Sequence, residues 1–341
     1  MTGVNAMKTK MNRRHAMQHQ GALFDVSGIE GARWKSVCAV GEYPVTRPSP
    51  RTAVVLADAL RWMAEAPENS IHAIVTDPPY GLLEYEDKDH DKLRDGIGGV
   101  WRIPPSFDGA NRIPVPRFTV LTAKDREHLT TFFQAFAFHA LRILVPGGHI
   151  VIASNPLVST TTFHAIETAG FEKRGEIIRV VKTLRGGDRP KNAEKEFPDV
   201  TVMPKSCWEP WGLFRKPIAE VTVAENLRRW GAGGFRRISG EEPFRDLIEC
   251  APASRSERAL APHPSIKPQK LMRQLVRAVL PVGTGIIYDP FSGSGSTLAA
   301  ASAVGHYAVG TERHPSYFAM ATGAIPALAK ISIGDSDDDG A

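Results

Sequence analysis

The chain has 341 residues, of which 42% are hydrophobic and 23% charged, so it is long enough for one large α/β domain with an inserted module. No apolar run approaches about 20 residues and the polar, basic N-terminus has no hydrophobic region, so we expect no transmembrane helix, secretory signal or membrane partner. The net charge of +5 mildly favours a polyanionic partner, while three scattered cysteines argue against disulfides and metal sites and fit the reducing cytoplasm.

The first 48 residues are polar and basic without clear periodicity. We expect them to form a flexible or partner-ordered arm, in which Phe24 or Trp34 could dock on the body. Strands and helices then alternate up to residue 182. The predicted elements are, in chain order, a strand over 52–56, a short helix through 60–63, a strand over 71–76, a Pro/Gly-rich loop over 81–122, a helix over 125–144, a strand over 149–153, a helix near 157–169 and a strand over 176–182.

Residues 183–262 differ from what precedes them, because they are rich in Arg, Lys, Pro, Trp and Gly and their hydrophobic runs are short. The alternation then resumes, and the chain ends in an acidic tail over 331–341. The predicted elements of this last part are a helix over 266–281, a strand over 285–289, a helix over 296–304, a strand over 306–311 and a helix near 315–330. The whole pattern predicts a parallel, doubly wound α/β sheet interrupted by an insertion.

The most informative stretch is Asp77-Pro78-Pro79-Tyr80, which follows the predicted strand over 71–76. Two consecutive prolines stop that strand, force an extended backbone and leave carbonyls pointing outward. A carboxylate, rigid backbone acceptors and an aromatic ring therefore gather at the carboxyl end of a strand, where open α/β sheets bind ligands. Such a site suits the exocyclic amine of a flat base, although a proline-rich strand exit with a capping Asp has the same pattern.

A second motif, Asp289-Pro290-Phe291-Ser292-Gly293-Ser294-Gly295-Ser296-Thr297, joins a predicted strand to an Ala-rich helix. Its two glycines let the backbone approach a ligand closely, and the helix N-terminus offers N–H donors. Glu312 ends the next predicted strand, where an acidic residue can accept hydrogen bonds from ribose hydroxyls. Leu298 stands where a dinucleotide-binding fold would have its third glycine.

The two motifs and Glu312 together resemble those of the S-adenosylmethionine-dependent amino-methyltransferases that methylate an exocyclic nitrogen of DNA bases. The catalytic motif precedes the cofactor turn, which is the order of the permuted beta class and counts against relatives that methylate glutamine or RNA guanine. The resemblance spans about residues 50–325 and includes His263-Pro264-Ser265-Ile266-Lys267-Pro268, where Ile266 replaces the usual Gln, and Leu144–His149. It implies a circularly permuted, Rossmann-like methyltransferase sheet.

The resemblance also implies roles for the matching residues. The catalytic residues would be Asp77, Pro78, Pro79 and Tyr80. The residues that bind S-adenosyl-L-methionine would be Asp58, Asp77, Ser265, Lys267, Asp289, Phe291, Ser292, Gly293, Gly295, Ser296, Thr297 and Glu312. For four of them a structural role stays open: Asp58 as a helix cap, Asp289 as a cap of the glycine turn, and Lys267 and Glu312 as surface charges.

In this class the target-recognition region lies between the two halves of the enzyme. It would occupy 183–262, between a catalytic half (49–182) and a cofactor-binding half (263–330). Residues 179–258 hold sixteen Lys or Arg against twelve acids, with aromatic residues interleaved, which suits contact with phosphates and bases. The predicted DNA-binding residues are Arg185, Lys191, Arg228, Arg229, Arg236 and Arg237. The glycine-containing loop over 82–111 is a candidate lid or base-flipping loop.

These features predict a site-specific DNA methyltransferase that acts on N6 of a flipped-out adenine in double-stranded DNA, without a metal or a covalent intermediate. Asp at the head of the Pro-Pro motif is commoner in adenine enzymes, whereas cytosine-N4 enzymes often carry Ser, so cytosine N4 is the alternative target. An inactive DNA-binding relative and an RNA or small-molecule methyltransferase are further alternatives. No cysteine follows a proline, so the Pro-Cys nucleophile of cytosine-C5 methylation is absent. The resemblance suggests a homodimer, a cognate restriction endonuclease and a cytoplasmic, nucleoid-associated location.

Overall fold

The computed structural model describes residues 26–79, 100–101, 115–116, 123–181, 187, 189–263 and 265–333. Its central sheet has nine strands among these residues, in the order β1-β2-β11-β10-β3-β6-β8-β7-β9. These strands are β1 (Val45–Ser49), β2 (Thr52–Leu56), β3 (Ile71–Thr76), β6 (Leu144–Ala153), β7 (Glu172–Val180), β8 (Trp208–Arg215), β9 (Leu247–Glu249), β10 (Ile286–Asp289) and β11 (Tyr307–Glu312). A separate two-stranded sheet consists of β4 (Val100–Trp101) and β5 (Val115–Pro116).

The helices are α2 (Val26–Cys38), α3 (Ala59–Glu65), α5 (Ala123–Ile143), α6 (Ser159–Thr168), α7 (Val223–Trp230), α8 (Arg255–Leu260), α9 (Gln269–Ala278), α10 (Ser296–Ala303) and α11 (Pro315–Ala329).

The strands β2, β11, β10, β3 and β6 are parallel to one another. They are rich in Val, Ile and Ala because strands covered on both faces need apolar side chains on both sides, and all six residues of β3 are buried. Parallel strands end at the same edge of a sheet. Asp77 follows β3, while Asp289 and Glu312 end β10 and β11, so the three carboxylates lie at one edge, called the carboxyl edge below.

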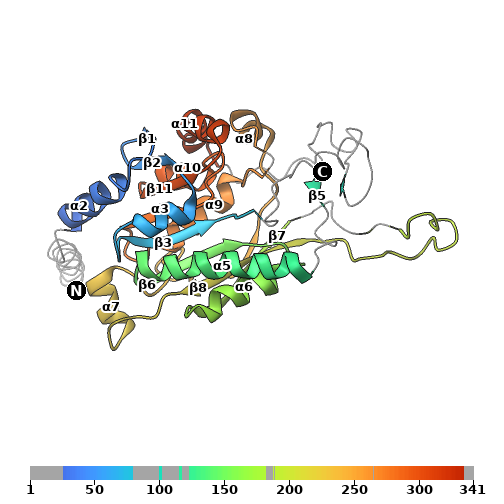
Figure 1. Cartoon of the computed structure of the whole chain (residues 1–341), viewed down its shortest axis with the longest axis horizontal. Helices are drawn as coiled ribbons and strands as arrows, with labels where there is room; N and C mark the ends of the chain where they lie inside the picture. Colours follow the sequence, from blue (N-terminus) through green and yellow to red (C-terminus); the bar gives the residue numbers. More distant parts are fainter. Residues whose placement is uncertain are drawn as a thin grey trace, which may run out of the picture.

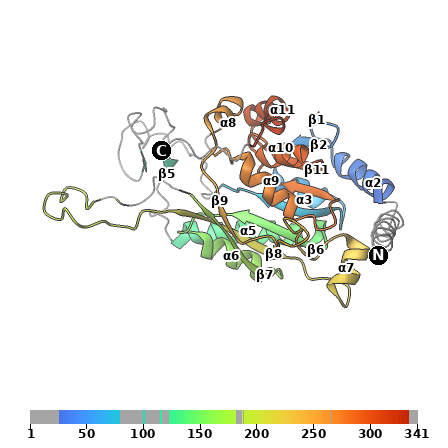
Figure 2. The same ribbon diagram turned by 180° about the vertical axis from the view of Figure 1, so that it is seen from behind.

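Helices cover both faces of the sheet (Figures 1 and 2). One face packs against α2, α3, α5 and α6, with Trp62 and Phe133 in its core, and the other packs against α9, α10 and α11, with Leu275 in its core. Alternate side chains of β3 serve the two layers, since Ile74 belongs to the first core and Val75 to the second. This is the predicted doubly wound α/β fold.

The sheet is not wholly parallel, because the predicted insertion contributes β8. This strand lies between β6 and β7 and runs antiparallel to both. It fills the core with Trp211 and Phe214, which are fully buried. Its hydrophobic run is short and interrupted by Glu209 and Pro210, so the sequence pattern does not separate it from its surroundings. Residues 208–215, and β9 at 247–249, therefore belong to the central sheet, and the target-recognition role of 183–262 stays a prediction.

Residues 26–48 of the predicted arm pack on the body, and Trp34 docks there as the sequence allowed. Trp34 of α2 is buried, and its ring lies 5.1 Å from that of Tyr307. Val37, one helical turn further on, is buried as well, and two apolar side chains at this spacing dock the helix. Arg33 Nη1 lies 3.2 Å from Nε2 of the buried His72. Residues 1–25, including Phe24, and 334–341 of the predicted tail lie outside the described residues.

Between β7 and β8 the chain forms a long extension that leaves the sheet and has no helix or strand among its described residues (Figures 1 and 2). Its pairing continues beyond the sheet, since Val181 N donates to Cys207 O (3.0 Å) and Gly187 N donates to Met203 O (2.9 Å). Residues 189–206 form its outer part, called the β7–β8 extension below. β7 runs in the same direction as β6, because both are antiparallel to β8. The extension therefore starts from the carboxyl edge.

Candidate active site

The two sequence motifs meet at the carboxyl edge, because β10 is the neighbour of β3. Thr76 Oγ1, in the last residue of β3, donates a hydrogen bond of 2.7 Å to Asp289 Oδ1 at the end of β10. This bond joins the strand that carries Asp77 to the strand that carries the glycine turn. The sheet topology thus places the predicted catalytic motif and the predicted cofactor turn side by side, as expected for a single site.

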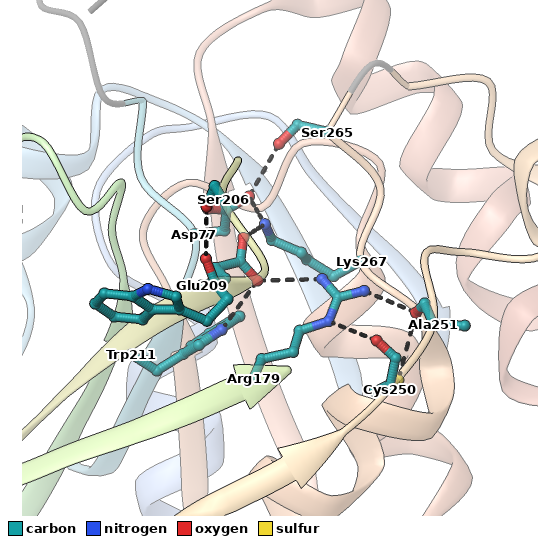
Figure 3. Close-up of polar contacts among 10 residues, drawn as sticks. Asp77, Arg179, Ser206, Glu209, Trp211, Cys250, Ala251, Ser265 and Lys267 are labelled. Atoms are coloured by element: carbon teal, nitrogen blue, oxygen red, sulfur yellow. Dashed lines mark hydrogen bonds and ion pairs between the residues drawn. The ribbon is translucent and has the colours of Figure 1, made fainter. Parts of the chain in front are cut away.

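Asp77 lies where β3 ends, and its carboxylate is held from the segment that precedes α9 (Figure 3). Ser265 Oγ donates to Asp77 Oδ2 (2.9 Å), and Lys267 Nζ lies 3.0 Å from the same oxygen. The prolines that follow end the strand as predicted, with Pro78 buried and Pro79 exposed. Tyr80 and the candidate lid over 82–111 lie outside the described residues.

The glycine turn has the close-packed geometry that its sequence predicts. Gly293 and Gly295 both have positive φ angles, of 50° and 86°. A Cβ on Gly293 would lie 3.1 Å from the His263 ring, and one on Gly295 would lie 2.4 Å from Ile325 Cγ1, so neither position accepts a larger residue without movement. Gly295 N donates to Ser292 O (2.7 Å), which closes the turn before α10. The Ser292 hydroxyl is buried and has no hydrogen-bond partner among the described residues.

Glu312 and Asp58 lie next to this turn. Glu312 accepts hydrogen bonds from Gly293 N at Oε2 (2.9 Å) and from His314 N at Oε1 (2.8 Å), so its carboxylate fixes the turn. Asp58 caps α3 by accepting from Arg61 N (3.1 Å). The neighbouring Ala57 N donates to Glu312 O (3.0 Å), which keeps the two acids at the same edge. Both acids thus have a structural role, and their contact with a cofactor stays a prediction.

The other predicted cofactor residues surround the same turn. Phe291 packs against α5, with its ring 6.0 Å from Phe132 and 6.3 Å from Phe136. Ser296 and Thr297 are buried in the first turn of α10. Thr297 also donates a side-chain hydrogen bond to Asp289. These residues form the wall of the site between α5 and α10.

Asp289 is a buried carboxyl with an unusual pKa. Burial raises its pKa to about 6 from an ordinary value of 3.8, although hydrogen bonds from Thr297, Thr76 and the Phe291 amide act in the opposite direction. A carboxylate that is buried in this way favours a positively charged group beside it, which would compensate the burial of the charge. A ligand amino group at this position would therefore be stabilised.

Asp289→Asn is expected to remove a pH dependence of stability. The folded pKa lies above the unfolded one, so the folded state binds the proton more tightly and the contribution of Asp289 to stability falls as pH rises from about 4 to about 6. From about pH 4.5 to about pH 7.5 the free energy of unfolding of the wild type should fall by roughly 2 kcal/mol relative to that of the variant. Urea unfolding of both proteins at the two pH values measures this, with exposed Asp246→Asn as the control. If wild type and variant differed by the same free energy of unfolding at both pH values, burial would not have raised the pKa of Asp289.

Two charged residues of the site, Glu209 and Arg179, lie outside the predicted set. Glu209 Oε1 lies 2.6 Å from Lys267 Nζ, and Glu209 Oε2 accepts from Arg179 Nη1 (3.1 Å) and Trp211 Nε1 (3.2 Å) (Figure 3). Burial by itself would lower the pKa of Lys267, but Asp77 and Glu209 outweigh burial and raise it. The available sequence signals were Arg179 directly after Ile177-Ile178 in β7 and Glu209 as the single acid of β8. Lys267 contacts the carboxylate of Asp77, the predicted catalytic residue, and its approach to the cofactor stays a prediction.

Four predicted DNA-binding arginines lie at the opposite edge of the sheet. Arg228 and Arg229 belong to α7, which is fixed to the start of β6 by Asn226 Nδ2 donating to Pro146 O (2.9 Å). Arg236 N donates to Ala278 O (2.8 Å) at the end of α9. The Arg237 side chain is bound to nearby backbone carbonyls. In Figures 1 and 2, α7 and the β7–β8 extension lie at opposite ends of the sheet.

These four arginines therefore lie at the edge of the sheet opposite Asp77, and their contact with DNA stays a prediction. The reason is β8, because a strand that returns from the carboxyl edge delivers the residues after it to the amino ends of the parallel strands. Lys191 is exposed on the β7–β8 extension, which starts from the carboxyl edge, while Arg185 lies outside the described residues. Among the described residues, no helix is long and apolar enough to cross a membrane, and no three His, Cys, Asp or Glu side chains gather as a metal site.

Known proteins share both the sequence and the fold. The N6/N4 methyltransferase family, described as DNA methylase, matches residues 71–323. Type II methyltransferase M.HindIII from Haemophilus influenzae is 24% identical over 295 residues, which cover 79% of this chain and 93% of the relative. PvuII DNA methyltransferase (cytosine-N4-specific) has a TM-score of 0.54 at 15% identity, covering 86% of this chain and 90% of that one.

A further solved structure is TTHA0409 from Thermus thermophilus in complex with S-adenosyl-L-methionine. Its TM-score is 0.50 at 22% identity, and the match covers 82% of this chain and 94% of that one. At these identities the structural likeness shows the fold alone, whereas the family match spans most of the chain and both motifs. This chain belongs to the N6/N4 DNA methyltransferase family.

Proposed function

We propose that this enzyme transfers the methyl group of S-adenosyl-L-methionine to the exocyclic N6 of an adenine in double-stranded DNA. The observation that carries the proposal is the Thr76–Asp289 hydrogen bond, which holds the Asp-Pro-Pro motif and the glycine turn in one site. Asp77 is thereby placed beside a turn whose backbone permits the close approach of a ligand.

The residues around the turn fit the donor. The Ser292 hydroxyl, which has no hydrogen-bond partner among the residues that the structure describes, and the helix start after Gly295 offer hydrogen-bonding groups. The buried Asp289 suits the amino group of the methionine part. We propose that Glu312 holds the ribose and that Asp58 lies near the adenine. When bound, S-adenosylmethionine supplies a methyl group on a positively charged sulfur. The complex of TTHA0409 with S-adenosyl-L-methionine supports this choice of donor.

The protein's part in the reaction is to hold the target amine. Its lone pair is delocalised into the ring, so the amine is a poor nucleophile and needs its lone pair directed at the methyl group. The Asp77 carboxylate and the Pro78 carbonyl accept hydrogen bonds from the two N–H groups of the amine. These bonds stabilise the positive charge that develops on nitrogen. Tyr80 stacks on the base, which contributes ~1–3 kcal/mol. A base inside a duplex cannot enter such a site, so the adenine is flipped out.

Cytosine N4 is the second candidate target. Asp at the head of the Pro-Pro motif favours adenine, while the likeness to the cytosine-N4-specific PvuII enzyme, at 15% identity, keeps cytosine open. Incubating DNA with the purified enzyme and methyl-labelled S-adenosylmethionine, followed by mass spectrometry of the nucleosides, decides between them. N6-methyl-2′-deoxyadenosine is the expected product. N4-methyl-2′-deoxycytidine would establish the alternative, and an unmodified DNA with no bound donor would indicate an inactive relative.

The DNA partner follows from the family, and we propose nucleoid association on the same ground. We propose that contact with DNA is made from the carboxyl edge, where Lys191 lies on the β7–β8 extension. A homodimer and a cognate restriction endonuclease remain proposals that rest on the class, and RNA is the less favoured substrate. Parallel assays with duplex DNA and RNA of the same sequence test the last point.

A further inference from the structure

We infer that Lys267 and Glu209 are positioning residues for Asp77: Lys267 holds the catalytic carboxylate, and Glu209 holds Lys267 and balances its charge. This inference rests on the proposed function, because it assigns the support of the group that binds the target amine. It also gives Lys267 a role different from contact with the cofactor.

The geometry is a chain of four alternating charges (Figure 3). Asp77, Lys267, Glu209 and Arg179 follow one another with separations of 3.0, 2.6 and 3.1 Å. Their side chains are 11%, 12%, 17% and 6% exposed, so the whole chain is nearly closed to water. Ser265 adds a second contact to the same oxygen of Asp77. Two donors on one carboxylate oxygen fix the orientation of the group.

The far end of this chain is anchored in the sheet. Arg179 and Glu209 face each other as a cross-strand pair of β7 and β8. Arg179 also donates from Nε to Cys250 O (3.1 Å) and from Nη2 to Ala251 O (2.7 Å), so its guanidinium is held on three sides. Trp211 Nε1 adds a hydrogen bond to Glu209. The position of Lys267 is therefore set by strands that carry none of the catalytic or glycine-turn residues.

Energetics favour a functional reason for these charges. Burying an ion costs several kcal/mol, and well-packed apolar residues often give equal or greater stability than a buried ion pair. A lone ammonium 3.0 Å from Asp77 would also oppose the positive charge that the reaction develops on the target amine. Glu209 removes that opposition and still lets Lys267 hold the carboxylate. Position and charge balance together explain why both residues are present.

A double-mutant cycle of Glu209→Gln and Lys267→Met tests the inference. Each single variant should lower kcat by about 10–100-fold, as when a supporting hydrogen-bond partner is lost, with a much smaller change in the dissociation constant of S-adenosylmethionine. The double variant should lose less than the product of the two single losses, because it removes the unbalanced charge of each. Losses that multiply, or single variants with wild-type kcat, would overturn the inference.

The matched control is Glu172→Gln. Glu172 and Arg215 are a second carboxylate–guanidinium pair of the same two strands, 2.6 Å apart at the other end of the ladder. This variant should keep wild-type kcat. Because loss of one buried partner can unfold a protein, thermal unfolding is measured for each variant. If Lys267→Met or Glu209→Gln does not fold, Ser265→Ala replaces it: this residue is exposed, and the variant should lower kcat about 3–10-fold through Asp77 alone.

Failure of the proposed function is recognised separately. If the wild type methylates no DNA, the proposed function fails, and the inference is then judged from crystal structures of Lys267→Met, or Ser265→Ala if that variant does not fold, and Glu172→Gln. The Asp77 side chain should leave its wild-type position in Lys267→Met, or in Ser265→Ala where that variant replaces it. It should keep this position in Glu172→Gln. An Asp77 carboxylate that stays in place without its ammonium or hydroxyl partner would overturn the inference on its own.

Discussion

Replacing Asp77 by alanine should lower kcat for methyl transfer by about 10³-fold, the size of effect seen when one group that stabilises transition-state charge is removed. The variant loses the carboxylate that accepts an N–H of the target amine and opposes the charge developing on nitrogen. Binding of S-adenosylmethionine should change by no more than about threefold, since the glycine turn and Glu312 are untouched. Single-turnover methylation of duplex DNA and equilibrium binding of the donor measure the two quantities.

The variant should remain folded, because Lys267 keeps its contact with Glu209 when Asp77 is lost. Glu167→Ala, which removes an exposed carboxylate from α6, serves as the control and should retain full activity. Activity of Asp77→Ala near that of the control would contradict the catalytic assignment. A parallel loss of donor binding would instead make Asp77 a cofactor ligand, as the family resemblance also allowed.

The fold could largely be predicted from hydrophobic runs. The stretch 71–76 and the stretch 286–289 are buried on both faces, and such strands are nearly continuous apolar segments bounded by turn residues. β8 was not predicted, because Glu209 and Pro210 interrupt its apolar pattern. The charge of Glu209 is neutralised by Lys267, a residue distant in sequence, and no local pattern shows that pairing.

That single strand also decides what could be predicted of the site. Asp77, Asp289 and Glu312 follow or end parallel strands, so their common edge follows from the alternation of strands and helices. The segment after β8 depends on the direction of β8 itself. Because β8 runs antiparallel to β6, the residues that follow it, including Arg228 and Arg229, lie at the opposite edge of the sheet. The basic and aromatic composition of this segment would be the same at either edge, so it does not predict which edge the segment occupies.

The position of Lys267 shows a second limit. Its motif predicts that it lies before α9 at the carboxyl edge, and it lies there in the structure. The motif does not predict its partners, which are Asp77 and Glu209. A motif fixes where the backbone of a residue lies more firmly than which neighbour its side chain selects. The selection depends on the charges that other elements bring, here Arg179 from β7 and Glu209 from β8.

Gly295→Ala should weaken donor binding by at least about tenfold, which corresponds to ~1.4 kcal/mol, and destabilise the protein by about 2–5 kcal/mol. Gly295 has a φ of 86°, which a residue with a Cβ adopts only with strain. The added methyl would also lie 2.4 Å from Ile325 Cγ1 of α11, a contact that forces the turn or the helix to move. Because Ser292 and Gly293 lie in the same turn, movement there reaches the groups proposed to hold the donor.

Gly323→Ala provides the matched control on the helix that Gly295 touches. Gly323 is exposed, has no atom within 4 Å of an added Cβ, and lies in the interior of α11, where alanine should stabilise the helix by about 0.5–1 kcal/mol. Urea unfolding and equilibrium binding of S-adenosylmethionine compare the two variants. Opposite signs in stability are expected, with donor binding lost only at Gly295. If both alanines had the same effect, the left-handed backbone and the close packing of the turn would not be what shapes the donor site.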